Sequence, residues 1–283
     1  MVFEIILLTL ALVGSLLAGL IDLKTTEIPD EIPYIMAGLG LLLNLIKSII
    51  FDSYTPILMS CVYGISFLIF GFLLYFTGQW GGGDAKVLSA LGFLLPEVSI
   101  KKTFFPFPIS LLFNVFFIGA IYMIFYMAIL SILNKKILKV FFIELSSKIK
   151  EFLIGLIVIS SILFLSSFFL FSKIMGLVNS FILSFSILST TIFLYLFYRF
   201  IKVVENVGFK RKIKVSQLKE GDVLDDSKIW EGLKKEEVEK IRKSGKKYVV
   251  IKEGVRFAPV FFISTIFTFL FGDFIFVLIK LIQ

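Results

Sequence analysis

The sequence contains no histidine among its 283 residues. This absence removes the usual general base of serine and cysteine hydrolases and the commonest protein ligand of zinc, haem and copper. Its single cysteine, Cys61, lies in an apolar stretch, so an intrachain disulfide and a paired-cysteine metal site are excluded as well. Any hydrolytic chemistry in this chain therefore has to use carboxylates, and we expect neither a metal ion nor a cofactor.

Charged residues are also scarce. They make up 18% of the chain, whereas apolar residues make up 58%, 35 of them phenylalanine, and the mean hydropathy is +0.98. A soluble domain of this length cannot bury so much apolar surface, so most of it must face lipid. No segment alternates polar and apolar residues as the strands of a membrane barrel do. The predicted fold class is an all-α polytopic membrane protein.

Eight apolar segments are candidates for transmembrane helices, since about 20 residues cross a bilayer as a helix. The fourth is short because Pro96 and Glu97 interrupt it, so we predict a bundle of about eight helices, with six to eight as the range. The first has no basic residue before it and no typical cleavage site, which favours a helix over a removable signal peptide. The segments are residues 2–21, 34–51, 56–77, 85–95, 106–133, 152–171, 174–198 and 257–282.

The chain is predicted to have three parts. Residues 1–198 form the helix bundle that carries the site, residues 199–256 form a polar insert, and residues 257–283 form the final transmembrane helix. The insert holds 17 basic and 10 acidic residues. Short strand patterns at 212–218 and 247–251 and a helical pattern at 234–243 indicate a small α+β fold. Its charge indicates a solvated surface attracted to anionic lipids, and no motif for nucleic-acid binding is present.

The distribution of lysine and arginine predicts the orientation. If all eight segments cross, the polar stretches around Asp22, residues 81–84, residues 134–151 and the insert emerge on one face, with 24 of the 29 basic residues. Basic residues prefer the cytoplasmic side, so this face is expected to be cytoplasmic. Because two helices separate Asp22 from Asp84, both carboxylates reach the same face in either orientation.

Asp22 and Asp84 are the candidate catalytic pair. Asp22 ends the first apolar segment, and Asp84 follows the triple glycine Gly81-Gly82-Gly83. Glycine admits backbone conformations closed to other residues and lets an extended substrate chain come close. Two carboxylates in a poorly solvated place share a proton, so one can activate water while the other polarises the scissile carbonyl. Taken singly, each aspartate also fits an ordinary helix-end residue.

The same residues resemble a known family. Gly81-Gly82-Gly83-Asp84 is similar to the GxGD motif of intramembrane aspartyl proteases. Asp22, followed by Ile28-Pro29-Asp30, resembles the first-aspartate region of type IV prepilin peptidases and archaeal preflagellin peptidases. The stretch Arg256-Phe257-Ala258-Pro259, with Gly272 further on, resembles the start of the final helix of that family.

The resemblance implies an endopeptidase that removes short basic leader peptides from pilin-like or flagellin-like precursors. Cleavage would take place at the cytoplasmic face of the cell membrane, with Asp22 and Asp84 as catalytic residues and Gly81, Gly82 and Gly83 as motif or substrate-binding residues. The chain lacks the cysteine-rich loop of the bacterial enzymes, and an insert before the last helix is closer to the archaeal branch.

Two other function classes compete with this interpretation. A cation-coupled transporter would use intramembrane carboxylates, although no inverted repeat is detectable and both aspartates lie at helix ends. A scaffold would recruit partners through the insert. Asp273, inside the last segment, is a further intramembrane carboxylate and is expected to face the bundle or lie near its outer end. We also predict a gap between Asp22 and Asp84 that substrate closes.

Overall fold

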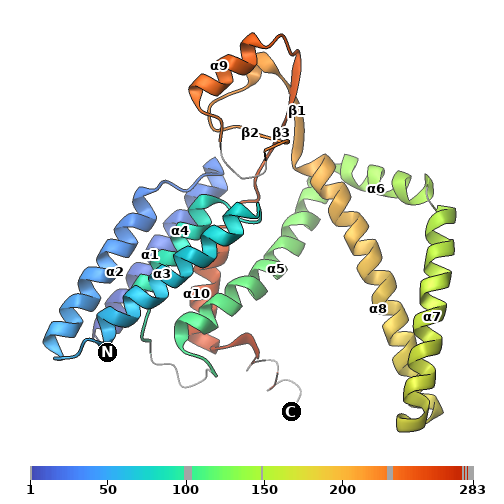
Figure 1. Ribbon diagram of the computed structural model, residues 1–283, viewed down its shortest axis with the longest axis horizontal. Helices are drawn as coiled ribbons and strands as arrows, with labels where there is room; N and C mark the ends of the chain where they lie inside the picture. The colour runs from blue at the N-terminus through green and yellow to red at the C-terminus, as the bar shows by residue number, and fades with distance from the viewer. Residues whose placement is uncertain are drawn as a thin grey trace. The chain divides into compact units, whose positions relative to one another are not determined.

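The computed structural model describes residues 2–98, 104–147, 149–227 and 232–275, with 277 and 279. Helices dominate, and a small three-stranded sheet lies in the polar insert (Figure 1). The helices are α1 (Val2–Thr25), α2 (Glu31–Ile50), α3 (Thr55–Phe76), α4 (Gly82–Leu94), α5 (Phe107–Leu133), α6 (Lys135–Ser147), α7 (Ile149–Met175), α8 (Leu177–Val203), α9 (Lys235–Lys243) and α10 (Pro259–Phe271). The strands are β1 (Lys210–Lys214), β2 (Val223–Leu224) and β3 (Tyr248–Lys252).

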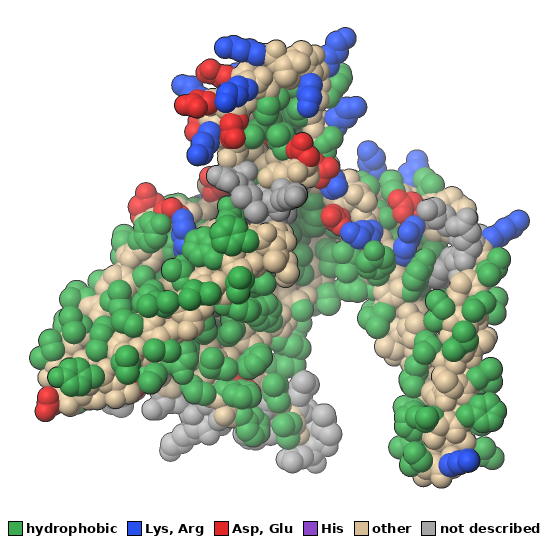
Figure 2. All heavy atoms as spheres, viewed as in Figure 1, with side chains coloured by type: hydrophobic (Ala, Val, Ile, Leu, Met, Phe, Trp, Pro, Cys, Tyr) green, Lys and Arg blue, Asp and Glu red, His purple; other side chains and the backbone are tan. Residues whose placement is uncertain are grey.

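The predicted fold class is confirmed. In the described part of the chain, six helices are long and apolar enough to cross a membrane, namely α1, α2, α3, α5, α7 and α8. Their outer faces carry apolar side chains, whereas the charged side chains gather on the insert and at helix ends (Figure 2). The count lies at the lower end of the predicted range because α4 and α10 are short.

Contacts divide the chain into two compact units. One contains residues 1–125 with 211–283, and the other contains residues 126–210. These units are not the three parts that the sequence predicts, and the boundaries of those parts stay a prediction.

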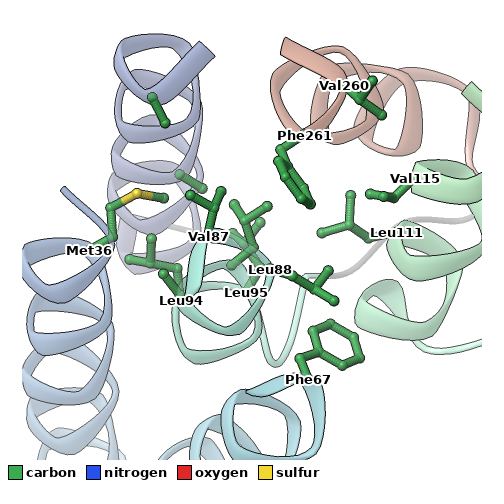
Figure 3. Close-up of a cluster of buried hydrophobic side chains, with 14 of the residues drawn as sticks. Met36, Phe67, Val87, Leu88, Leu94, Leu95, Leu111, Val115, Val260 and Phe261 are labelled. Atoms are coloured by element: carbon green, nitrogen blue, oxygen red, sulfur yellow. The ribbon is translucent and has the colours of Figure 1, made fainter. Parts of the chain in front are cut away.

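Within the first unit, α4 is the central helix. It has 13 residues, about 20 Å at 1.5 Å per residue, which is less than the bilayer core of about 30 Å. Eight of its 13 residues are buried, and apolar residues from α2, α3, α5 and α10 converge on it (Figure 3). A helix enclosed by other helices does not need to match the bilayer in length.

Polar side chains on α2 and α3 form hydrogen bonds that fix the position of the carboxyl end of α4. Asn44 Nδ2 and Ser60 Oγ both donate hydrogen bonds to the carbonyl oxygen of Phe93, at 3.0 and 2.7 Å. Ser89 Oγ on α4 donates to the carbonyl oxygen of Gly64 at 2.9 Å. Small polar residues of this kind let membrane helices pack closely and hydrogen-bond to each other.

The prediction of one continuous last helix over 257–282 is wrong. The helix α10 ends at Phe271, because Gly272 adopts a positive φ of 78° that stops helical geometry. Asn114 of α5 stabilises the break by donating to the carbonyl oxygen of Gly272 at 2.9 Å and accepting from the Phe274 N–H at 3.0 Å. Asp273 is 3% exposed and accepts a hydrogen bond from the Phe104 N–H, so it faces the protein interior as expected.

In the second unit, residues 134–151 were expected only as a polar stretch between two membrane helices. The chain forms α6 there, because Ile137, Val140 and Phe141 recur at helical spacing between lysines. Ile137 is fully buried and packs with Val203 and neighbouring apolar residues, and α7 packs along α8. Ser167 Oγ on α7 donates to Ser184 Oγ on α8 at 2.8 Å.

The insert is a small sheet with one helix. Its strand order is β1-β3-β2, and β2 pairs antiparallel with β3, with Val223 opposite Lys252. Leu218, Val238 and Ile251 form its buried core. The predicted helix is present as α9 and the predicted second strand as β3, whereas β1 begins earlier than predicted and β2 was not expected.

Candidate active site

One cavity of about 1230 Å³ in the first unit is lined by both Asp22 and Asp84. Its walls come from the end of α1, the glycine turn before α4, the middle of α5, and the insert with the segment that follows β3. The sequence predicts that the two aspartates reach one face, and here they lie on one surface. The lining includes Asp22, Lys24, Glu27, Ile28, Tyr75, Trp80, Gly81, Gly82, Gly83, Asp84, Lys86, Phe116, Gly119, Asp222, Lys252, Glu253, Arg256 and Phe257.

Asp22 lies in the last turns of α1 and is 5% exposed. Its Oδ2 accepts a hydrogen bond from the Ala258 N–H at 3.0 Å, at the start of α10. Gly19, nearly one turn earlier, makes this approach achievable, because a Cβ there would lie 3.0 Å from the Cα of Pro259. The carboxylate of Asp22 is therefore held against the backbone that opens the last helix.

Asp84 lies in the first turn of α4. Its Oδ2 accepts a hydrogen bond from the Gly81 N–H at 3.1 Å, and Gly81 has an extended backbone, as residues before a helix do. Carboxylates are favoured in this position because the first N–H groups of a helix lack partners and carry partial positive charge. Asp84 thus has the capping role that the sequence allowed, and it also lines the cavity.

The two carboxyl groups are close enough to interact electrostatically. No hydrogen bond joins them among the interactions of the described residues, since Asp22 is bonded to Ala258 and Asp84 to Gly81. The predicted closure of this gap by substrate stays a prediction. Their assignment as the catalytic pair also stays a prediction at this point.

The two sequence elements around the aspartates are packed against each other. A Cβ on Gly83 would lie 2.9 Å from the Cβ of Ile28, so the Ile28 side chain packs directly against the backbone of Gly83. Lys86 Nζ forms an ion pair with Asp30 Oδ1 at 2.6 Å, which joins the start of α4 to the residue before α2. The turn after α1 and the glycine turn before α4 are thereby held together.

Alanine at Gly83 is expected to reduce the proposed activity about tenfold or more, because the added methyl overlaps Ile28 and displaces the turn that carries Asp84. Gly38→Ala on α2 is the control, since its Cβ would meet nothing within 4 Å and Gly38 does not line the cavity. Rates of precursor cleavage at equal protein concentration measure the difference. Equal rates for the two variants would show that Gly83 does not position the site.

Several residues of the site were not singled out as functional by sequence reasoning. Trp80, directly before the glycines, is buried and packs on Phe116 of α5 and on Phe257, with ring centroids 5.8 and 5.6 Å apart. Arg256 and the backbone of Ala258 also belong to the site. The only sequence signal was their position, next to the glycine motif or at the start of the last apolar segment.

Metal binding has no support in the described residues, where no group of three or more acidic or cysteine side chains lies close enough to hold an ion. The expectation of a site without metal or cofactor remains a prediction.

Part of the sequence matches a known protein family. Residues 8–124 match the family described as the type IV leader peptidase family, and this region contains both aspartates and all three glycines. The match covers less than half of the 283 residues, and it shows that this region is similar to that family. The resemblance inferred from the glycine motif and from Asp22 is therefore confirmed, whereas the transporter alternative receives no support from any match.

The curated relatives that match this chain are archaeal. The prepilin peptidase EppA of Methanothermobacter thermautotrophicus is 27% identical over 160 residues, which cover 52% of this chain and 38% of the relative. The preflagellin peptidases of Methanococcus voltae and Methanocaldococcus jannaschii are 36% and 34% identical over 88 residues, or 31% of this chain and 37% of each relative. The matched regions thus span less than two-fifths of these relatives. No solved structure matches the chain.

Proposed function

We propose that this protein is an intramembrane aspartyl endopeptidase that removes short basic leader peptides from pilin-like or flagellin-like precursors. The observation that carries the proposal is the presence of Asp22 and Asp84 on the wall of one cavity, inside the region that matches the leader peptidase family. The names of the curated relatives support the substrate class.

The proposed reaction needs only the two carboxyl groups and water. The ionised carboxylate takes a proton from a water molecule as the water oxygen attacks the scissile carbonyl carbon. The protonated partner donates its proton to the carbonyl oxygen. The first carboxyl group then gives the proton taken from water to the leaving nitrogen as the carbon–nitrogen bond breaks, and the second carboxylate recovers a proton from a hydroxyl of the tetrahedral intermediate. Asp22 and Asp84 perform these steps at the wall of the cavity that both line.

The glycine turn provides room for the substrate backbone. Gly82 has no close neighbour apart from the Tyr75 ring at 3.8 Å, and Gly81, Gly82 and Gly83 all line the cavity. An extended peptide next to this turn would present its carbonyl between the aspartates without meeting a side chain. We therefore propose that these glycines contact the substrate.

The proposed site lies on the side of the membrane that carries the insert, because insert residues such as Asp222 and Lys252 line the same cavity. The insert has a net charge of +7, from 17 basic and 10 acidic residues. Basic loops stay on the cytoplasmic side, so we propose that cleavage occurs at the cytoplasmic face.

The test uses membranes that contain the protein and a precursor with a basic leader and a hydrophobic segment. We expect the precursor to be shortened by membranes with the protein and to stay intact in matched membranes without it. Uptake driven by a sodium or proton gradient, with no shortening of the precursor, would instead favour the transporter class and overturn the proposal.

A further inference from the structure

The segment between β3 and α10 is part of the active-site wall. Residues 252–257 line the cavity, and the next residue, Ala258, donates its N–H to Asp22. The last helix therefore contributes to the site through the chain that enters it from the insert.

Two contacts fix the backbone of this segment. The Tyr122 hydroxyl of α5 donates to the carbonyl oxygen of Arg256 at 2.7 Å. The Phe257 ring lies against Trp80 and against Gly119, where an added Cβ would be 2.8 Å from the ring. With its backbone held at these two points, Arg256 has little freedom to leave the site.

The Arg256 side chain lies within electrostatic range of the Asp22 carboxylate. Its Nε is buried and has no hydrogen-bond partner among the described residues. A buried donor without a partner is costly, and a guanidinium that lines the same cavity as Asp22 can stabilise negative charge there.

We infer that Arg256 is a positioning residue that keeps Asp22 ionised, so that Asp22 is the base for water and Asp84 carries the shared proton. This inference rests on the proposed function. The two aspartates have unequal surroundings, because Asp22 accepts the Ala258 N–H and shares its cavity with the Arg256 side chain, whereas Asp84 accepts the Gly81 N–H and lies within electrostatic range of Asp22.

The other charges near the pair do not reverse this assignment. The first turn of α4 favours an ionised Asp84, but a helix end carries only about half a positive charge, less than the full charge of Arg256. Lys86 is already paired with Asp30 at 2.6 Å. Lys24 and Glu27, at and just after the end of α1, are exposed and of opposite sign. Four of the insert charges that line the cavity have partners of their own: Arg211 pairs with Glu253 at 2.9 Å, Lys252 Nζ donates to the Ser227 carbonyl oxygen, and Asp222 accepts from the Lys219 N–H.

The test is the pH profile of kcat/KM for the purified protein in lipid vesicles, with wild type, Arg256→Gln and Arg256→Lys. Removing the charge in Arg256→Gln is expected to move the acidic limb of the profile up by about one pH unit and to lower kcat more than it raises KM. Arg256→Lys keeps the charge, so its limb is expected to stay with that of the wild type.

An acidic limb in Arg256→Gln that superimposes on the wild-type limb would overturn the inference, even if the rate is lower. If Arg256→Gln does not fold, the test relies on Arg256→Lys. This variant keeps the positive charge, so an acidic limb displaced by one pH unit would contradict the proposed role of Arg256. The proposed function fails separately, namely when the wild type itself does not cleave. Cleavage by wild type, its loss in Asp22→Asn and an unmoved limb in Arg256→Gln would reject this inference alone.

Discussion

Replacing either Asp22 or Asp84 with asparagine is expected to lower precursor cleavage by at least about a hundredfold, the usual contribution of a general acid or base. Asparagine has nearly the same shape as aspartate, and its oxygen can still accept the N–H of Ala258 or Gly81 that each carboxylate accepts now. Since the amide cannot exchange a proton, the variant loses chemistry and keeps its fold. Initial rates from reconstituted protein measure the loss.

Asp52→Asn provides the matched control for this pair. Asp52 lies in the exposed turn between α2 and α3 with a positive φ of 48°, a conformation that asparagine adopts readily. Its cleavage rate is expected to match that of the wild type. A wild-type rate in Asp22→Asn or in Asp84→Asn would contradict the dyad.

Alanine in place of Gly40 is expected to destabilise the protein by about 1–3 kcal/mol, as overpacking does in a tight core. A Cβ on Gly40 would lie 2.8 Å from the carbonyl carbon of Phe93 and 2.9 Å from the Leu94 nitrogen. Backbone atoms cannot yield as a flexible side chain can, so α2 must move away from α4. That movement stretches the hydrogen bond from Asn44 to Phe93.

Gly38→Ala is the control with the opposite expected sign. It lies on the same helix, is exposed, and a Cβ there would meet nothing within 4 Å. Alanine in a helix interior is favoured over glycine by about 0.5–1 kcal/mol, so this variant is expected to be slightly more stable. Thermal unfolding of both purified variants in detergent measures the pair. Similar loss of stability in both would show that the contact between α2 and α4 is not as close as described.

The sequence could predict the membrane class and a common location for the two aspartates because both follow from the number and length of the apolar segments. Apolar segments of known length identify helices that cross the bilayer, and an even number of crossings between Asp22 and Asp84 brings them to one face. The glycine motif added the expectation of an open backbone. None of this required knowledge of which helices touch.

The features that the sequence did not predict depend on tertiary contacts. The sequence predicted a short fourth segment but not its enclosure by the surrounding helices, and the break at Gly272 depends on Asn114, far away in the chain. The bond from the Ala258 N–H to Asp22 uses backbone atoms, which leave no mark in a sequence. The sequence shows Arg256 as a cation before the last helix, but it does not show that Arg256 and Asp22 line the same cavity.

The most direct test of the central claim is the intact mass of the products that purified protein releases from a precursor with a basic leader. We predict two fragments, the leader and the remaining chain, whose masses add up to that of the precursor plus one water. Recovery of the uncut precursor with folded protein, or fragments from scattered positions, would contradict a leader peptidase that uses Asp22 and Asp84.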